Sequence, residues 1–290
     1  MANAIELAKA YVPLLDEVYK LASLTSELDG APELATQGAN ANELIIPMLD
    51  MQGLGDYSRN DGYVKGDVTL KNETIKGNFD RGRMFTVDSM DDLETAGIAF
   101  GRLAGEFIRT KVVPELDAFR FACYAGKAGI TKVSGTLADG AAVIAALRSA
   151  TTAMDEAEVP IEERYLYITP TLHGLVQDMD TTKSREVFQR FAAIKDVPQN
   201  RFYTAIEQRS GKAGEEAGGY AKAAGGAEIN FMVIHKPAVI QFPKHIAPKI
   251  ITPDVNQDSD AYKFGYRNVG IADTYANKVA GIYLHHKATA

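Results

Sequence analysis

The sequence predicts an α+β fold, and three observations lead to this prediction. Helix-like and strand-like segments follow one another without the strand–helix–strand rhythm of a parallel sheet. One amphipathic pattern predicts a helix over 91–127, which at ~1.5 Å per residue would be roughly 50 Å long. A stretch from Gly55 to Phe85 alternates like β-structure but offers few large apolar side chains to a core.

The amino-acid composition argues against some classes of function. The 290 residues are 46% hydrophobic and 24% charged, which is ordinary globular composition and enough for roughly two domains. The net charge of −7 argues against a surface that grips nucleic acid, because Lys and Arg are interspersed with Asp and Glu. We expect neither a membrane span nor a signal peptide, since long apolar runs and a basic N-terminal start are both missing.

The N-terminal region predicts a helix and a connector. Apolar residues recur at three- and four-residue steps over 1–28, which favours an amphipathic helix. The Gly-, Pro- and Asn-containing stretch Glu27–Asn42 is typical of a loose connector. Two alternatives stay open for this helix: it is tethered to the body of the protein, or it packs on its own domain as an ordinary first helix.

The alternating stretch predicts a β-hairpin. Glu43–Leu49 precedes it as a short strand, in which Pro47 favours an edge or a strand end. One arm runs through Val68–Ile75, the other through Phe79–Val87, and Lys76–Asn78 provides a turn. Because an isolated two-stranded hairpin is marginally stable, something must cover this one. Its mixed charges favour a polar contact, either with a neighbouring subunit or with its own domain.

The long helix contains one breaker. The apolar pattern continues past Pro114 to Cys123, although proline lacks an N–H and its ring clashes with the carbonyl of Thr110. We therefore expect a kink at Pro114, or two abutting helices.

The remainder of the chain mixes shorter elements. A helix is predicted over Ala138–Val159, and shorter helices within 171–179 and 184–194. Strands are predicted within 164–170, 201–206, 229–242, 248–253, 260–268 and 278–287. Gly211–Glu228 is rich in Gly and Ala and is predicted to be a loop.

The search for chemistry in the sequence finds no catalytic, cofactor-binding or metal site. The glycine-rich stretch after Ser210 lacks the spacing and the Ser or Thr of a phosphate-binding loop. Asp254–Gly265 begins like a calcium loop, but Ser259 occupies the position of the turn glycine and Gly265 that of the bidentate Glu. The only cysteine, Cys123, excludes an intrachain disulfide, is compatible with a reducing cytoplasm and is expected to be a small buried apolar residue.

The order of these parts resembles a known family. An N-terminal arm, a charged extended hairpin and a long helix, with the strings "DRGR" (Asp80–Arg83) and "AGEFIRTKVVP" (Ala104–Pro114), are similar to the major capsid proteins of tailed bacteriophages with the Hong Kong 97 fold. The resemblance extends over nearly the whole chain, including the strand-rich end from Ile229.

The resemblance implies a domain division. Residues 1–42 would be the N-terminal arm and 43–88 the extended loop, called the E-loop. Residues 89–169 and 245–290 would form the peripheral domain, with its spine helix at 91–127, and 170–244 the axial domain. The E-loop would lie over the next subunit in a ring, and its charged residues would contact that subunit. They are Asp56, Arg59, Lys65, Asp67, Lys71, Glu73, Lys76, Asp80, Arg81 and Arg83.

The resemblance also implies the function and the partners. The protein would be a non-enzymatic coat protein without cofactors, assembling as pentamers and hexamers into an icosahedral head around double-stranded DNA. It would belong to the virion, and to the host cytoplasm during assembly. Because only about 40 residues precede the E-loop, we expect a separate scaffolding protein or none, together with a portal. Some family members join subunits by Lys–Asn bonds, but no motif here identifies the Asn.

Two alternatives remain. The chain could form the shell of an encapsulin-like nanocompartment that holds a cargo enzyme. It could also be a soluble α+β enzyme with an unrecognised site. Assembly that depends on the hairpin would distinguish a shell protein from such an enzyme.

Overall fold

The computed structural model describes residues 23–30, 36–37, 43–60, 62–89, 98–179 and 181–288. Most of the predicted N-terminal helix and the first turns of the predicted spine helix lie outside these residues. The chain divides into two compact units, which we call the hairpin unit (Ala31–Asn78) and the body (Met1–Gly30 with Phe79–Ala290).

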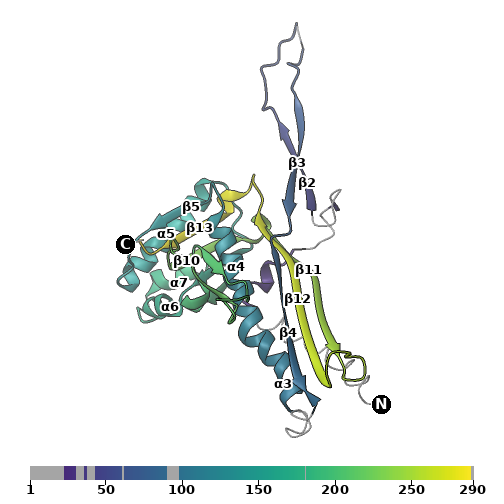
Figure 1. Cartoon of the computed structure of the whole chain (residues 1–290). Helices are drawn as coiled ribbons and strands as arrows, with labels where there is room; N and C mark the ends of the chain where they lie inside the picture. The colour runs from purple at the N-terminus through teal and green to yellow at the C-terminus, as the bar shows by residue number, and fades with distance from the viewer. Residues whose placement is uncertain are drawn as a thin grey trace. The chain divides into compact units, whose positions relative to one another are not determined.

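The body is an α+β structure, as predicted (Figure 1). Its helical segments are η1 (Ser26–Leu28), α3 (Ile98–Phe107), η3 (Ile108–Val112), α4 (Val113–Gly126), α5 (Gly140–Glu156), α6 (Pro170–Gln177), α7 (Thr182–Phe188), η4 (Gln199–Arg201), η5 (Lys236–Ala238) and η6 (Val279–Gly281). Its strands are β4 (Phe79–Asp88), β5 (Thr131–Ser134), β6 (Arg164–Ile168), β7 (Ala193–Asp196), β8 (Ile206–Gln208), β9 (Tyr220–Lys222), β10 (Ile229–His235), β11 (Val239–Ile251), β12 (Ala261–Thr274) and β13 (Ile282–His286).

A five-stranded sheet with the order β5-β13-β10-β6-β7 separates two cores. Every residue of its central strand β10 is buried, because helices cover both faces of the sheet. Phe231 and Val233 pack with α5, α6 and α7, whereas Met232 and Ile234 face the core that contains α4. The alternation of side chains across a strand explains this division.

A second sheet, β11-β12-β4, supports the long helix (Figure 1). β12 pairs antiparallel with both β11 and β4, and Phe264 faces Phe85 in the register. Aromatic contacts attach β4 to the helix: the rings of Phe79 and Phe119 lie 5.0 Å apart, and those of Phe85 and Phe107 lie 4.7 Å apart.

The predicted disturbance at Pro114 is present as a π-helical turn. α3 and α4 are joined by η3, in which the N–H of Val113 donates to the carbonyl of Ile108, five residues earlier. Pro114 follows as the second residue of α4, and because it has no N–H, one hydrogen bond of the continuous helical run is missing there. The wider turn thus lets helical backbone continue across a residue that lacks a donor.

The predicted pairing of the hairpin is wrong. The strand β3 (Val68–Lys76) pairs with β2 (Glu43–Met51), and β2 also pairs with β1 (Thr36–Gln37). β4 pairs instead with β12 in the body. Gly77 does not have the positive φ that a two-residue type I′ hairpin turn requires.

Three other expectations need correction. The predicted strand within 201–206 is replaced by the turn η4 and by β8, which starts at Ile206. β9 forms inside the predicted Gly/Ala-rich loop, and β5 was not predicted. Residues 26–28 form a 3-10 turn rather than the end of an α-helix, and Leu28 is buried in a core of the body.

The described residues contain no helix long and apolar enough to span a membrane.

Candidate functional site: surfaces for subunit contact

The hairpin unit consists of β2 and β3 with a long excursion between them. The register runs from Glu43 opposite Lys76 to Met51 opposite Val68. Beyond the last pair, Ser58 and Gly62 exchange backbone hydrogen bonds of 3.2 and 2.8 Å. Gly62 has φ +79°, a conformation that favours glycine. We call the excursion, residues 52–67, the outer end of the hairpin.

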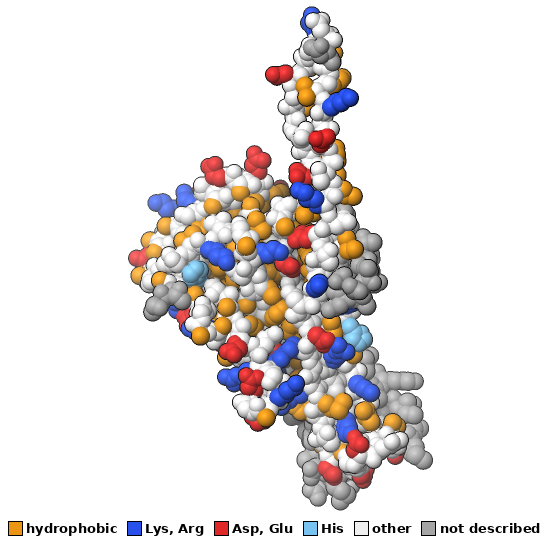
Figure 2. Space-filling view, turned by 45° about the horizontal axis from the view of Figure 1, so that its top comes forward, with side chains coloured by type: hydrophobic (Ala, Val, Ile, Leu, Met, Phe, Trp, Pro, Cys, Tyr) orange, Lys and Arg blue, Asp and Glu red, His pale blue; other side chains and the backbone are white. Residues whose placement is uncertain are grey.

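The hairpin exposes apolar side chains, which the sequence analysis underestimated. Eight of the thirteen large apolar side chains that are exposed in the described chain lie on it: Leu49, Met51, Leu54, Tyr57, Tyr63, Val64, Val68 and Leu70. Figure 2 shows these orange surfaces interleaved with charged side chains along the ribbon. Such a concentration of exposed apolar side chains is typical of interaction surfaces.

Seven of the predicted contact residues lie on the hairpin, on the strand β3 or in the outer end. Asp56, Arg59, Lys65, Asp67, Lys71 and Lys76 are exposed and Glu73 is half-buried. Lys71 lies 3.5 Å from Asp50 across the strands, and both side chains remain mostly exposed. The hairpin therefore presents charges of both signs beside its apolar residues.

The other three predicted contact residues, Asp80, Arg81 and Arg83, lie on β4 in the body, which corrects their predicted place on a hairpin arm. Asp80 accepts two hydrogen bonds from Arg267, at 2.8 and 2.6 Å, and these hold the pKa of its carboxyl below the usual value. Arg81 Nε lies 2.7 Å from Glu115 Oε1 on α4. These partners lie within the same chain.

Arg81 and Arg83 also attach a loop of the body to β4. Arg81 donates to the carbonyls of Arg209 and Gly219, at 2.8 and 3.3 Å. Arg83 donates to the carbonyls of Glu216 and Ala217, at 2.8 and 3.4 Å. The glycine at 218 has φ +61°, and a Cβ there would lie 2.8 Å from Arg83 Nη1. Residues 209–219, which we call the glycine loop, are thus shaped around these two arginines.

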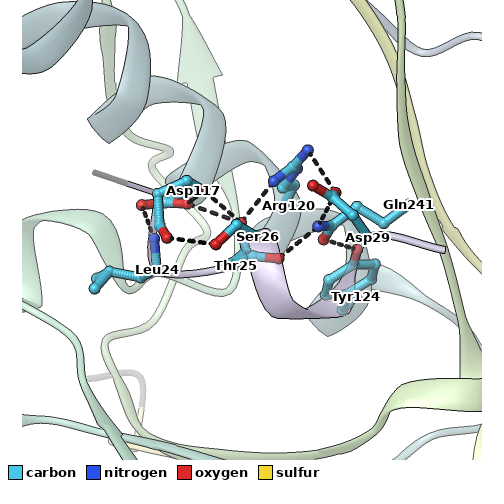
Figure 3. Close-up of polar contacts among 9 residues, drawn as sticks. Leu24, Thr25, Ser26, Asp29, Asp117, Arg120, Tyr124 and Gln241 are labelled. Atoms are coloured by element: carbon cyan, nitrogen blue, oxygen red, sulfur yellow. Dashed lines mark hydrogen bonds and ion pairs between the residues drawn. The ribbon is translucent and has the colours of Figure 1, made fainter. Parts of the chain in front are cut away.

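A buried carboxylate binds the described N-terminal segment (Figure 3). Asp117 of α4 is fully buried and accepts hydrogen bonds from Ser23 Oγ (2.9 Å), Thr25 Oγ1 (2.8 Å) and the N–H of Leu24 (3.2 Å). Arg201 lies 3.4 Å from its second oxygen. The carboxylate therefore connects residues 23–25 to α4.

The same network continues towards β11 (Figure 3). Gln241 donates to the carbonyl of Thr25 (2.6 Å) and to Asp29 (2.7 Å), while Tyr124 donates to Gln241 Oε1 (2.6 Å). Arg120 donates to Thr25 Oγ1 at 2.8 Å. Burial raises the pKa of the Tyr124 hydroxyl, so this group remains a donor. Residues 23–28 therefore pack on the body, with Ser23, Thr25 and Leu28 buried.

The described residues do not form a metal centre. No group of three or more His, Cys, Asp and Glu among them could hold an ion. Cys123 is half-buried, and burial together with the charge of Asp273 raises the pKa of its thiol to about 12. His173 Nδ1 lies 2.7 Å from Asp196 Oδ1 and its Nε2 lies 3.1 Å from Gln177 Nε2, so both ring nitrogens have a partner.

The fold belongs to a class found in viral shells. No protein-family model matches the sequence, and no curated protein sequence matches it. Solved structures match the fold over most of the chain, and they support the predicted Hong Kong 97 fold.

Three of these structures illustrate the match. A structure from Mycobacterium phage Che8 is 14% identical, with a TM-score of 0.64 over 91% of this chain and 90% of that chain. The virus-like particle from Pyrococcus furiosus is 12% identical, with a TM-score of 0.60 over 93% and 95%. The capsid structure of the cyanophage P-SCSP1u is 16% identical, with a TM-score of 0.55 over 87% and 85%.

Proposed function

We propose that this protein is a major capsid protein that self-assembles as pentamers and hexamers into the icosahedral head of a tailed phage or prophage. The observation that carries the proposal is the hairpin unit, whose large apolar side chains are exposed in the single chain. The fold shared with phage capsid structures supports it.

The energetics favour coverage of the hairpin by another copy. A two-stranded hairpin is marginally stable alone in water. Removing one large apolar side chain from water contributes about 1.5–3 kcal/mol when burial is complete. Several such residues on one ribbon therefore favour association, and a head-to-tail contact between identical chains closes into rings.

The domain names follow as part of the proposal. Residues 43–78 would be the E-loop, shorter than the predicted 43–88 because β4 pairs within the body. Residues 89–169 and 245–290 would form the peripheral domain together with β4, and 170–244 the axial domain. The subunit contact would involve the seven charged residues on the hairpin and the apolar residues beside them.

The proposal includes a structural role without catalysis, a virion location and assembly in the host cytoplasm. Partners would be further copies of the chain, a separate scaffolding protein and a portal, with double-stranded DNA enclosed without specific binding. The net charge of −7 is compatible with enclosing DNA rather than gripping it.

Electron microscopy of the expressed protein tests the proposal, with and without a co-expressed scaffolding protein. We expect closed shells from the full chain. A variant in which Gln52–Gly66 is replaced by Asn-Gly should give only unassembled, folded subunits, because the deletion stops well before the core residue Phe79. Small discrete oligomers of the full chain under every condition would contradict the proposal.

A nanocompartment shell is the second candidate, favoured by the match to a virus-like particle. The contents of purified particles distinguish the two. Nuclease-protected double-stranded DNA supports a phage head, whereas a stoichiometric protein cargo without DNA supports a compartment.

A further inference from the structure

His285 on β13 is a buried imidazole that the proposed shell function does not use. Its side chain is 4% exposed. The ring stacks on that of Phe231 in β10, with the ring centres 5.2 Å apart and an angle of 18° between the planes. Burial and, after it, the charge of His286 hold the pKa of this imidazole below its usual value. His285 is therefore neutral at pH 7 in the folded chain.

The hydrogen bonds of Asn230 determine which nitrogen of the His285 ring carries the proton. The Nδ2 group of Asn230 donates to the carbonyl of Gly135 at 3.1 Å and lies 3.0 Å from His285 Nδ1. An amide NH2 group only donates, so Nδ1 accepts and is unprotonated. The one proton of the neutral ring is therefore on Nε2.

These contacts hold the segment that follows β5, the strand at the edge of the central sheet beside β13 (Figure 1). All four side chains of β5 are exposed. Gly135 donates its N–H to the carbonyl of His286 at 2.9 Å, and Leu137 packs on the core that contains α5. A Cβ on Gly135 would lie 3.6 Å from His285 Nε2, so the backbone of this segment lies against the ring.

A proton on Nδ1 of His285 is incompatible with this arrangement. It would point at the NH2 group of Asn230, so that two donors would face each other in a buried site. Turning the amide over would offer the ring an acceptor, but it would place Asn230 Oδ1 against the carbonyl oxygen of Gly135. In either orientation one buried polar contact is lost, and such a loss is costly where water cannot replace the partner.

The neighbouring His286 has the opposite arrangement. Its Nδ1 lies 2.7 Å from the carbonyl of Lys287, and a carbonyl only accepts, so this nitrogen donates. A second proton on the ring of His286 therefore leaves its hydrogen bond intact. The two adjacent histidines differ in the direction of the bond at Nδ1.

The charged groups on the elements around His285 do not compensate a proton there. Lys132 of β5 is exposed and is itself a cation. Glu228, which precedes β10, lies 2.6 Å from Lys287. Asp139 caps α5 and accepts a backbone N–H at 2.8 Å. The carboxylates of these elements thus already have partners.

We propose that neutral His285 and Asn230 form an acid-sensitive latch that holds Gly135–Leu137 on the central sheet, and that protonation of His285 opens it. On opening, this segment and β5 would separate from β13. The latch lies within one chain, so the inference does not depend on the proposed shell function.

Hydrogen exchange of the full chain, followed by mass spectrometry at pH 7.5 and pH 5.5, tests the latch. After correction for the intrinsic exchange rate, the protection of amides in 131–137 should be about tenfold lower at pH 5.5. The open form takes up a proton at about pH 6.5, whereas the closed form takes it up only at lower pH, so acid favours the open form. Equal protection at the two pH values would overturn the inference.

Two substitutions separate His285 from its neighbour. His285→Asn keeps a side-chain acceptor near the position of Nδ1 but does not titrate, so the change in protection of 131–137 should fall below about twofold. His286→Asn should keep the tenfold change, because the latch does not use that ring. His235, whose pKa burial also lowers, lies at the other end of β10 and is common to all variants. A full response in His285→Asn, or its loss in His286→Asn, would overturn the inference.

Nitrogen NMR of the chain labelled with ¹⁵N-histidine gives a measurement that does not require His285→Asn to fold. At pH 7.5, His285 should show an unprotonated Nδ1 and a protonated Nε2. A proton on Nδ1 at this pH would contradict the hydrogen-bond direction on which the latch depends.

Discussion

At the scale of single residues, Asp117 shows how a charge is accommodated in the interior. Its carboxylate accepts three hydrogen bonds from residues 23–25 and lies near Arg201. A buried carboxylate is costly unless such donors replace water. The interaction therefore fixes the described N-terminal segment to the spine and is not a surface ion pair of little consequence.

Replacing Asp117 with Ala should lower the free energy of unfolding by about 2–4 kcal/mol, because the donors that it satisfies stay buried. Urea denaturation of the unassembled subunit measures the change. Asp139→Ala removes only the N-cap contact to the N–H of Ala142 and should cost about 1 kcal/mol. Equal, small losses for the two variants would show that the Asp117 network contributes little.

The thiol of Cys123 should be unreactive in the folded subunit. Its pKa, raised to about 12 mainly by burial, keeps it protonated at pH 8, and the thiolate is the reacting form. Ellman's reagent should react slowly with native protein and promptly after unfolding in guanidinium chloride. Prompt reaction of the native subunit would contradict the packing described for α4.

The sequence predicts the surroundings of some single residues but not of others. Cys123 lies within an apolar helical pattern, which predicted burial, but its side chain is only half-buried. The role of Asp117 could not be recognised from the sequence, because its partners Ser23 and Thr25 are distant in sequence and are ordinary polar residues. Periodicity identifies the buried face of a helix but not the polar group that a buried charge will meet.

At the scale of elements, β4 shows the limit of alternation as a signal. Period-2 alternation correctly predicts that β3 and β4 are strands, but it carries no information about their partners. Phe79 and Phe85 of β4 pack against the long helix. In the body, β4 pairs with β12. The placement of Arg81 and Arg83 on a hairpin arm was therefore wrong, and both side chains have hydrogen-bond partners within the body.

The double variant Arg81→Ala with Arg83→Ala should loosen the glycine loop. Its loss of five hydrogen bonds, one of them charge-assisted to Glu115, should lower the free energy of unfolding by about 1–2 kcal/mol. Limited proteolysis should cut within 209–219 faster than in the parent chain. If these arginines lay on a hairpin arm, assembly would instead be expected to weaken more than subunit stability.

Arg59→Ala with Lys65→Ala is the matched control for that experiment. Both side chains are exposed on the hairpin, so subunit stability should stay within about 0.5 kcal/mol of the parent. A larger loss of stability in this control than in the β4 variant would reverse the interpretation.

At the scale of the whole molecule, the sequence predicted the architecture well because its large elements have strong patterns. The buried run of β10 and the amphipathic patterns of α4 and α5 indicate the central sheet and its helices. Short strands with exposed or partly exposed side chains, such as β5 and β9, have no such pattern. The apolar surface of the hairpin was missed because its members are scattered in sequence and gather only when β2 pairs with β3.

Replacing Leu54 and Tyr63 with Ser together should raise the concentration needed for assembly by at least about tenfold. Both side chains are exposed in the subunit, so its melting temperature should be unchanged. Ile161→Ser, an exposed apolar residue of the body, serves as the control. Light scattering follows assembly, and calorimetry follows the melting of the subunit. A lower melting temperature with unchanged assembly would indicate that the hairpin is covered by its own chain.

The partners of β4 have a consequence for synthesis on the ribosome. β2 and β3 are close in sequence and can pair while translation continues, whereas Phe85 must wait for Phe264 near the end of the chain. The β2–β3 hairpin can therefore be complete on a nascent polypeptide long before the sheet that β4 shares with β12. If the chain forms a shell as proposed, a nascent chain would expose its hairpin before its body is complete, so assembly would have to wait until translation ends.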